Sequence, residues 1–174
     1  MLYIDYIKIA RFFRKLLPIY FNDSTPLLRH KHEMFYFRDL HEYSVIEHRI
    51  VLIYTQFIRD LIESPDNKNS TNTSKQRYHK YKYAQEYLDA YICFDDFCKL
   101  FHSSVLSKQQ CSEIFHSICL SHVSEEDKQY TKQELFITYD MFVMFLYKLD
   151  EHAFHEFMSC FYYSVNDFQQ ELHK

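Results

Sequence analysis

Glycine is absent from this sequence of 174 residues, where ordinary usage would give about 12. Glycine supplies positive φ angles and lets the backbone approach a ligand closely. Phosphate-binding loops, dinucleotide-binding turns and nucleophile elbows all depend on it. The absence therefore disfavours most enzyme classes, and we expect neither catalytic residues nor a cofactor.

Tryptophan is also absent, and there are only 3 prolines. A chain with so little glycine and proline is poorly equipped for sheets joined by tight turns and well suited to helices joined by polar loops. The 17 Phe and 16 Tyr residues provide ample apolar surface for a core. We therefore expect an all-α fold, a multi-helix bundle built as one body or as two helical lobes.

Positive charge is not in excess, because 24 acidic residues outnumber 20 basic ones and the formal net charge is -4. The chain as a whole therefore does not attract nucleic acid or an anionic membrane. Five cysteines, an odd number, and a start without a signal-peptide core predict free thiols in a reducing compartment. No apolar run approaches the roughly 18 residues of a membrane span. We expect a soluble intracellular protein, cytoplasmic or cytoskeletal, whose partners are other proteins.

Three helices are predicted in the first part of the chain. Apolar residues recur with helical spacing over residues 2–20, and a second, less regular helix is expected over residues 27–43. The third helix is the clearest, because Ser44 and Glu47 form a capping box that satisfies two backbone donors at a helix start.

A polar stretch divides the chain. Residues 64–76 are almost wholly polar, and we interpret them as a mobile loop between an N-terminal helical region, 1–63, and a C-terminal helical region, 77–174. Basic and aromatic residues alternate directly after this loop. Such interleaving suits base stacking and phosphate contact, but on an acidic chain a solvated helix face is favoured. The residues of this basic-aromatic patch are Arg77, Tyr78, Lys80, Tyr81 and Lys82.

The C-terminal region contains an internal repeat. Residues 92–101 and 137–146 both begin with Ile, an aromatic residue, Asp and Phe at the same spacing. Each copy then continues with apolar residues at helical spacing. Between the copies, Ser107 and Gln110 form a second capping box, which opens a helix. The repeat positions that we expect in the core are Ile92, Phe97, Ile137 and Phe142.

This repeat resembles the second half of an EF-hand. There, an Ile at the eighth loop position pairs across a two-stranded ladder, an acidic residue closes the loop and a Phe opens the exiting helix. The resemblance implies that Ile92 and Ile137 are ladder partners. It also implies entering helices over Val51–Ile62, or a shorter one within Arg77–Ala84, and over Lys108–Leu120.

The calcium ligands of that family are not matched. A calcium loop needs oxygen ligands at alternating positions, Gly at its sixth position and a closing Glu. The sixth positions are Ala90 and Leu135, and Met141 replaces the closing acid of the second copy. The remaining ligand positions hold Gln85, Tyr87 and Asp89 in the first loop and Tyr130, Lys132 and Glu134 in the second. The resemblance therefore implies a degenerate, calcium-independent pair.

Two other groups of residues are weighed against metal binding. Cys111, His116, Cys119 and His122 include zinc-ligand types, but on one helix they do not converge tetrahedrally. His152 and His155 lie three residues apart, which is not the His-Glu-x-x-His spacing of a metalloprotease. We therefore predict no metal site.

The last part of the chain is an aromatic stripe that we expect to be helical and to extend to Phe168. It either packs against the helix that contains Phe142 or forms a contact face for a partner protein. The candidate contact residues are Phe154, Phe157, Phe161 and Tyr162.

These observations favour a non-enzymatic structural or adaptor protein that acts through protein–protein contacts. The EF-hand resemblance implies a cytoskeletal or ciliary assembly. An alternative is a viral helical bundle of the Bcl-2 type, which would bind an amphipathic helix and regulate cell death of the host.

Overall fold

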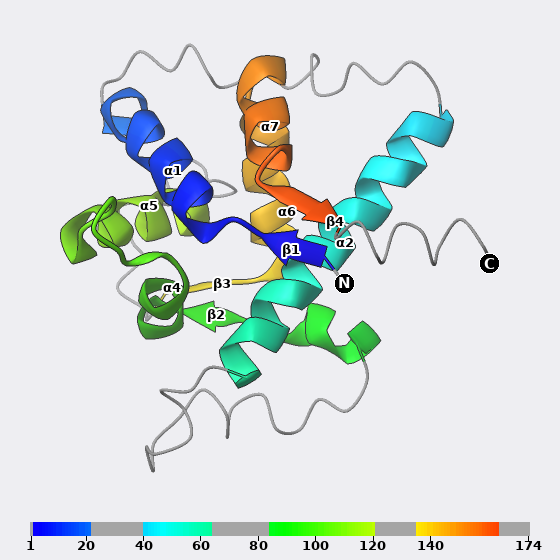
Figure 1. Cartoon of the computed structure of the whole chain (residues 1–174), viewed down its shortest axis with the longest axis horizontal. Coiled ribbons are helices and arrows are strands. Elements are labelled where there is room, and N and C mark those ends of the chain that lie inside the picture. The colour runs from blue at the N-terminus through cyan, green and yellow to red at the C-terminus, as the bar shows by residue number, and fades with distance from the viewer. Residues whose placement is uncertain (1, 22–39, 64–83, 121–134, 164–174) are drawn as a thin grey trace.

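The structure is a computed structural model, and it describes residues 2–21, 40–63, 84–120 and 135–163 (Figure 1). Within these ranges the chain forms six α-helices, one 3-10 helix and four short strands. The helices are α1 (Tyr6–Phe21), α2 (Leu40–Glu63), η2 (Ala84–Asp89), α4 (Phe94–Phe101), α5 (Lys108–Leu120), α6 (Tyr139–Lys148) and α7 (Glu151–Met158). The strands are β1 (Leu2–Ile4), β2 (Ile92–Cys93), β3 (Phe136–Ile137) and β4 (Phe161–Tyr163).

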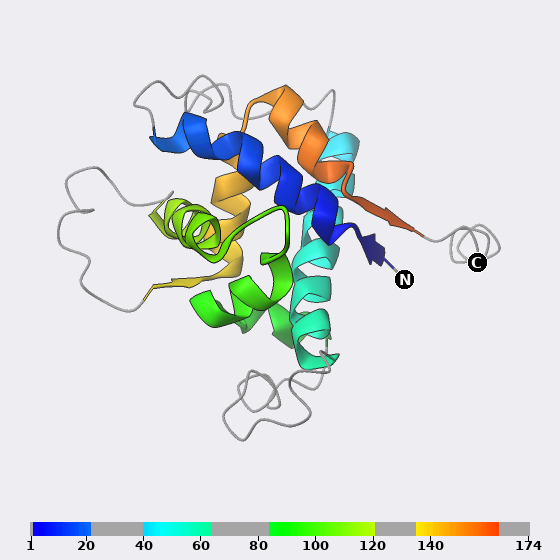
Figure 2. The same cartoon turned by 60° about the vertical axis from the view of Figure 1, so that its left-hand side comes forward.

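The helices pack together, so the prediction of a mainly helical fold is confirmed for the described residues. α1 packs against α4, α5 and α7, and Figure 2 shows it lying across them. α2 packs against η2, α4 and β1. None of the helices in the described ranges is long and apolar enough to cross a membrane.

Two antiparallel ladders, each of two strands, add to the helices. β2 pairs with β3, and β1 pairs with β4. The second of these joins the two ends of the described chain, with Leu2 opposite Tyr163 and Ile4 opposite Phe161. An all-α prediction did not include the β1–β4 ladder.

The start of the chain corrects the prediction of a helix over residues 2–20. Residues Leu2–Ile4 form β1, and α1 begins only after Asp5. The Asp5 carboxylate accepts a hydrogen bond from the backbone N–H of Lys8 at 3.0 Å, which is how an N-cap residue satisfies a free backbone donor. The backbone N–H of Asp5 donates to the Cys160 carbonyl at 2.9 Å, so the cap also anchors α1 beside β4.

The end of the aromatic stripe differs from its prediction in a similar way. α7 ends at Met158, and Phe161 and Tyr162 lie in a strand. The Arg49 guanidinium on α2 donates to the Phe161 carbonyl at 2.6 Å and to the Met158 carbonyl at 3.3 Å. The arginine thereby connects α2 to the last residue of α7 and to the first residue of β4.

Helix starts were predicted correctly in one case and wrongly in another. α5 spans the predicted residues, and its capping box is present: Ser107 N–H donates to Gln110 Oε1 at 2.9 Å and Gln110 N–H to Ser107 Oγ at 3.2 Å. α2 begins at Leu40, four residues before Ser44, because a Ser-x-x-Glu sequence is also compatible with a helix interior. The predicted start at Ser44 was wrong.

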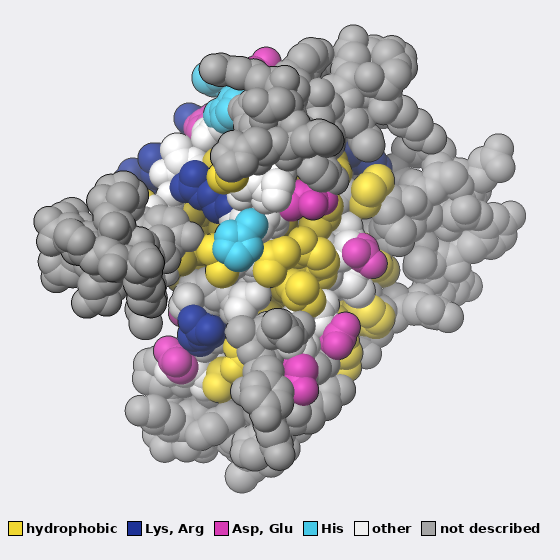
Figure 3. Space-filling model, turned by 90° about the vertical axis from the view of Figure 1, so that its right-hand side faces the viewer, with side chains coloured by type: hydrophobic (Ala, Val, Ile, Leu, Met, Phe, Trp, Pro, Cys, Tyr) yellow, Lys and Arg dark blue, Asp and Glu magenta, His cyan; other side chains and the backbone are white. Residues whose placement is uncertain are grey.

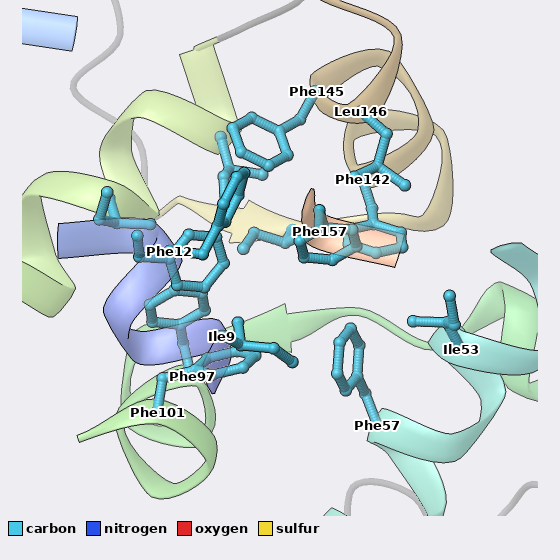
Figure 4. Close-up of a cluster of buried hydrophobic side chains, with 14 of the residues drawn as sticks. Ile9, Phe12, Ile53, Phe57, Phe97, Phe101, Phe142, Phe145, Leu146 and Phe157 are labelled. Atoms are coloured by element: carbon cyan, nitrogen blue, oxygen red, sulfur yellow. The ribbon is translucent and has the colours of Figure 1, made fainter. Parts of the chain in front are cut away.

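The core is one cluster of buried side chains to which all six α-helices contribute. Figure 4 shows aromatic rings from both ends of the chain meeting there. The ring centroids lie 6.0 Å apart for Phe13 and Phe97, 5.6 Å for Phe57 and Phe142, and 5.5 Å for Phe12 and Phe157. Aromatic pairs at such separations stabilise a core beyond their area burial. In the described residues the N-terminal and C-terminal regions therefore share one core.

Candidate functional site

The β2–β3 ladder brings the two repeat copies together. Its register places Ile92 opposite Ile137 and Cys93 opposite Phe136. Ile92, Phe97, Ile137 and Phe142 are all buried. The four repeat residues therefore lie in the core, and the two isoleucines are direct neighbours across the ladder.

A buried tyrosine on α2 connects the two strands. The Tyr54 hydroxyl is fully buried and donates to the Ala90 carbonyl at 2.6 Å, with the Ile137 carbonyl 3.3 Å away. The Tyr54 ring packs edge-on against Tyr139 at 5.5 Å. One α2 side chain thus fixes the backbone on both sides of the ladder. Sequence reasoning did not find this role, because nothing in helical spacing distinguishes Tyr54 from an ordinary core aromatic.

The segment before β2 is a 3-10 helix rather than an open loop. With Ile92 at the eighth position, the first five loop positions are residues 85–89, and these lie in η2. The Ala90 N–H donates to the Tyr87 carbonyl at 3.2 Å, and no described non-glycine residue has a positive φ. A calcium loop needs a sharp turn at its sixth position. Ala90 follows directly after η2 and does not have the positive φ angle that glycine would allow.

In the EF-hand alignment Asp96 would close the loop of the first copy, and its carboxylate is 1% exposed. The Cys93 thiol donates to Asp96 Oδ2 at 3.2 Å, and Lys99 Nζ lies 3.7 Å from Oδ1. A buried carboxylate needs compensation of this kind. Here both of its oxygens have protein partners, where a calcium loop would direct them to the ion. Lys99 was not singled out from the sequence, although its spacing of three residues from Asp96 on a helix is a recognisable signal.

The outer side of the ladder carries an exposed aromatic pair. Tyr91 and Phe136 are 38% and 39% exposed, and their ring centroids lie 4.7 Å apart. A second exposed pair lies on the β1–β4 ladder, where Tyr3 and Tyr162 stack at 5.8 Å and are 49% and 52% exposed. Each ladder therefore presents two adjacent aromatic rings to solvent.

Three of the four predicted contact residues lie in the core. Phe154, Phe157 and Phe161 are buried, and Phe157 packs 6.0 Å from Phe142. The apolar face of α7 turns inward, where Phe157 packs against Phe12 and Phe13 of α1 and against Phe142 of α6. Of the four residues only Tyr162 is exposed, so it alone is accessible to a partner protein.

Other predicted features are placed as follows. The polar stretch 64–76, the basic-aromatic patch, and the second-loop positions Tyr130, Lys132 and Glu134 lie outside the described residues. Met141 is half-buried in α6. On the face shown in Figure 3, apolar side chains gather near the centre, and charged side chains of both signs lie around them.

The cysteines and histidines form no metal centre in the described ranges, where no group of three or more potential ligands converges. Cys111 and Cys119 are buried, His116 is exposed and bonded to the Ser112 carbonyl, and His122 lies outside the described ranges. Burial raises the pKa of the Cys119 thiol to about 12, so it behaves as a small apolar side chain.

Comparison with known proteins provides no relative from which a function could be proposed, so a proposal depends on this geometry. The chain matches no protein-family model, no curated protein sequence and no solved structure.

Proposed function

We propose that the C-terminal region contains a degenerate, calcium-independent EF-hand-like pair in a non-enzymatic adaptor or structural protein. The observation that carries this proposal is the register of the β2–β3 ladder, in which Ile92 lies opposite Ile137. The two residues come from copies of one sequence pattern, and pairing at this position is what the EF-hand resemblance implies.

The absence of calcium dependence follows from the first copy. Calcium binds six to eight oxygens in a flexible loop, whereas residues 85–89 form a 3-10 helix and the closing carboxylate of Asp96 contacts Cys93 and Lys99. The Tyr54 hydroxyl holds the ladder from the α2 side. The pair is therefore held together by protein contacts where the family uses a cation.

Protein–protein contact is supported by the exposed aromatic pairs. Tyrosine and phenylalanine are enriched in interfaces because they bury large areas at a low cost in side-chain entropy. Tyr3 with Tyr162 and Tyr91 with Phe136 supply two such pairs on rigid ladders. A cytoskeletal or ciliary assembly is the setting that the EF-hand resemblance implies.

Calorimetric titration with calcium chloride, after dialysis against a chelator, tests the first part of this proposal. We expect no binding heat at millimolar calcium and an unchanged melting temperature. A site with micromolar affinity would overturn the calcium-independent assignment. Tight binding of a BH3-type helical peptide would instead support the Bcl-2-like alternative.

Affinity purification from a cell extract, read out by mass spectrometry, tests the second part. The protein is compared with two double variants, Tyr3→Ser/Tyr162→Ser and Tyr91→Ser/Phe136→Ser. Val45→Ser is the control, because Val45 is an exposed apolar residue on α2, outside both aromatic pairs. We expect one double variant to lose a partner that the control retains. A partner set that is identical in all four proteins would contradict a role for the aromatic pairs.

A further inference from the structure

One helix presents charge of a single sign to solvent. Among residues 6–17 of α1 the exposed ones are Ile7, Lys8, Arg11, Arg14 and Lys15. All but Ile7 are basic, and α1 contains no acidic residue, whereas every other α-helix in the described ranges contains at least one. The chain as a whole has more acidic than basic residues. Positive charge is therefore concentrated on one helix of an acidic protein.

The four basic residues form one continuous surface, which we call the cationic face. Arg11 lies three residues after Lys8 and four before Lys15, and Arg14 lies three residues after Arg11. Residues three and four apart are neighbours on the surface of a helix. With a rise of 1.5 Å per residue, the face extends over about 10 Å along α1.

Contacts with α7 hold one edge of the cationic face. Lys15 Nζ lies 2.7 Å from Glu156 Oε1, and Lys8 Nζ donates to the Ser159 carbonyl at 3.2 Å. The Lys15 side chain nevertheless remains 69% exposed. Two of the four cations are thus positioned by the fold and are still accessible from solvent.

The charge pattern of α1 does not favour the helix itself. Like charges three and four residues apart repel one another. The helix dipole favours acidic residues in the first turn and basic residues in the last, whereas α1 has neither and has Lys8 in its first turn. Since folding gains nothing from this pattern, a binding role accounts for it better. We propose that the cationic face binds an acidic segment of a partner protein, with two or more carboxylates within about 10 Å of one another.

Carboxylates suit this face. Glu156 already contacts Lys15 within the chain, and the planar guanidinium groups of Arg11 and Arg14 can each bind a carboxylate through two hydrogen bonds. Exposed ion pairs are individually weak, so several of them are needed. A partner segment with several acidic residues supplies them together.

Phosphate-bearing partners fit the face less well. Single-stranded nucleic acid is bound by cations together with exposed aromatic rings, but the exposed residues of α1 include no aromatic, and Phe12 and Phe13 are buried. An anionic membrane is bound by a helix that inserts its apolar face. The apolar face of α1 is buried in the core, which leaves Ile7 alone for insertion.

This inference rests on the proposed protein–protein function for the class of its partner, and it uses neither the aromatic pairs nor the EF-hand resemblance. The two are tested on different residues. If the aromatic variants lose a partner but no acidic probe binds, only the present inference fails. If an acidic probe binds at α1 but the aromatic variants retain every partner, only the role of the aromatic pairs fails.

Fluorescence anisotropy of the full chain with defined probes tests the proposal. The first probe is a short labelled peptide of alternating Glu and Ser, and its control replaces every Glu with Gln. We expect micromolar binding of the Glu peptide at low ionic strength, weaker binding at about 0.15 M salt, and no binding of the Gln peptide. Absence of binding at low ionic strength would overturn the proposal. Tighter binding of oligothymidylate, or of vesicles of phosphatidylserine and phosphatidylcholine, would also overturn it.

Matched variants assign the binding to the cationic face. Arg11→Gln and Lys108→Gln each remove one exposed positive charge, the first from α1 and the second from α5. Arg11→Gln should weaken binding and Lys108→Gln should not, and Arg11→Gln/Arg14→Gln should weaken it about five- to tenfold. Equal losses for the two single variants would show attraction to overall charge and would contradict a specific face.

Two further measurements keep the assignment independent of folding. The double variant should melt no lower than the wild type, because it removes like-charge repulsion; a lower melting temperature would show that the arginines serve the fold. In the wild type, a carbodiimide should couple the Glu peptide to Lys8 or Lys15, as mapped by mass spectrometry. Coupling mainly at Lys108 or at another lysine would overturn the location.

Discussion

The two repeat copies share a backbone course but start their helices with different chemistry. In the second copy the Thr138 hydroxyl accepts a hydrogen bond from the N–H of Met141 at 3.2 Å, which is an ordinary N-cap. In the first copy Cys93 occupies the same position, and its thiol does not cap α4 but donates to Asp96. In the first copy, the side chain at the cap position of α4 therefore contacts the buried Asp96 carboxylate and does not accept a hydrogen bond from the helix backbone.

The difference teaches that a ladder register can be retained while the surrounding polar groups change. Ile92 and Ile137 are buried, and a shift of one residue would turn both toward solvent. The register is therefore specified by apolar burial. Positions 93 and 96, and their equivalents 138 and 141, then differ without disturbing the pairing.

The largest effects are expected from truncating the first core residue of each exiting helix. Phe97→Ala and Phe142→Ala should each reduce the free energy of unfolding by about 3–5 kcal/mol, because each leaves a cavity in a close-packed core. Urea unfolding measures the change. Val45→Ala, at an exposed site on α2, is the control and should be nearly neutral. A loss below about 1 kcal/mol for only one of the two phenylalanines would show that the copies do not contribute equally to the core.

A smaller effect should separate the closing positions. Asp96→Ala should cost about 2–3 kcal/mol, because it leaves the Lys99 ammonium, about one-third exposed, without its carboxylate. Met141→Ala, at the equivalent half-buried position, should cost about 1 kcal/mol. Chemical denaturation of both variants tests this order. If Asp96→Ala is the milder change, the buried carboxylate is not a structural contact of the first copy.

For the residues at the helix starts, the larger loss of stability is expected in the second copy. Thr138→Ala should destabilise the protein by about 1 kcal/mol, since it removes the N-cap of α6. Cys93→Ala should cost about 0.5 kcal/mol, because a thiol-to-carboxylate hydrogen bond is weak. Thermal unfolding monitored by circular dichroism resolves the two values. Cys93→Thr offers the converse experiment and should stabilise α4, whereas a loss of stability would show that Asp96 depends on the thiol.

The smallest effect near neutral pH is a loss of stability in alkali that arises at the cysteines of α4 and α5. Burial raises the pKa of Cys98, and that of Cys111 to about 12, from an unfolded value of 9.0, while the second copy's α6 contains no cysteine. The folded state thus holds these protons more tightly than the unfolded state. The stabilisation is fully present below pH 9 and is lost as the pH rises toward 12.

Unfolding by urea at about pH 8 and about pH 10.5 tests this response. Cys111→Ala should lose less stability between the two values than the wild type, whereas Thr138→Ala should lose as much as the wild type. Tyr6 will contribute to the loss in every variant, because burial and the neighbouring Asp60 raise its pKa. Equal slopes for wild type and Cys111→Ala would contradict the assignment of part of the response to Cys111.

Local patterns predicted those parts of the fold that depend on neighbouring residues. α5 begins after Ser107 as predicted, because a capping box involves residues only three apart. The repeat was readable for the same reason, since Ile, Asp and Phe recur at fixed short spacing. The start of α2 was predicted wrongly because Ser44 and Glu47 fit a helix interior as well as a helix start.

The candidate site was predictable only in outline. The repeat singled out Ile92 and Ile137, and the structure places them side by side. It did not single out Tyr54, which lies on α2 and joins the site through a long-range hydrogen bond. The sequence left open whether the aromatic stripe packs in the core or contacts a partner, because an aromatic helical face has the same pattern whether it is buried or exposed. The structure places Phe154, Phe157 and Phe161 in the core.

What the sequence alone determined is the helical character, the position of α5 and the recurrence of one short pattern at residues 92–97 and 137–142, since each follows from propensity and short spacing. Only the tertiary structure decided that Leu2–Ile4 pairs with Phe161–Tyr163. It also placed three aromatic residues of α7 and β4 in the core. These outcomes depend on which apolar faces bury one another, and that choice is made by the whole core rather than by any local segment.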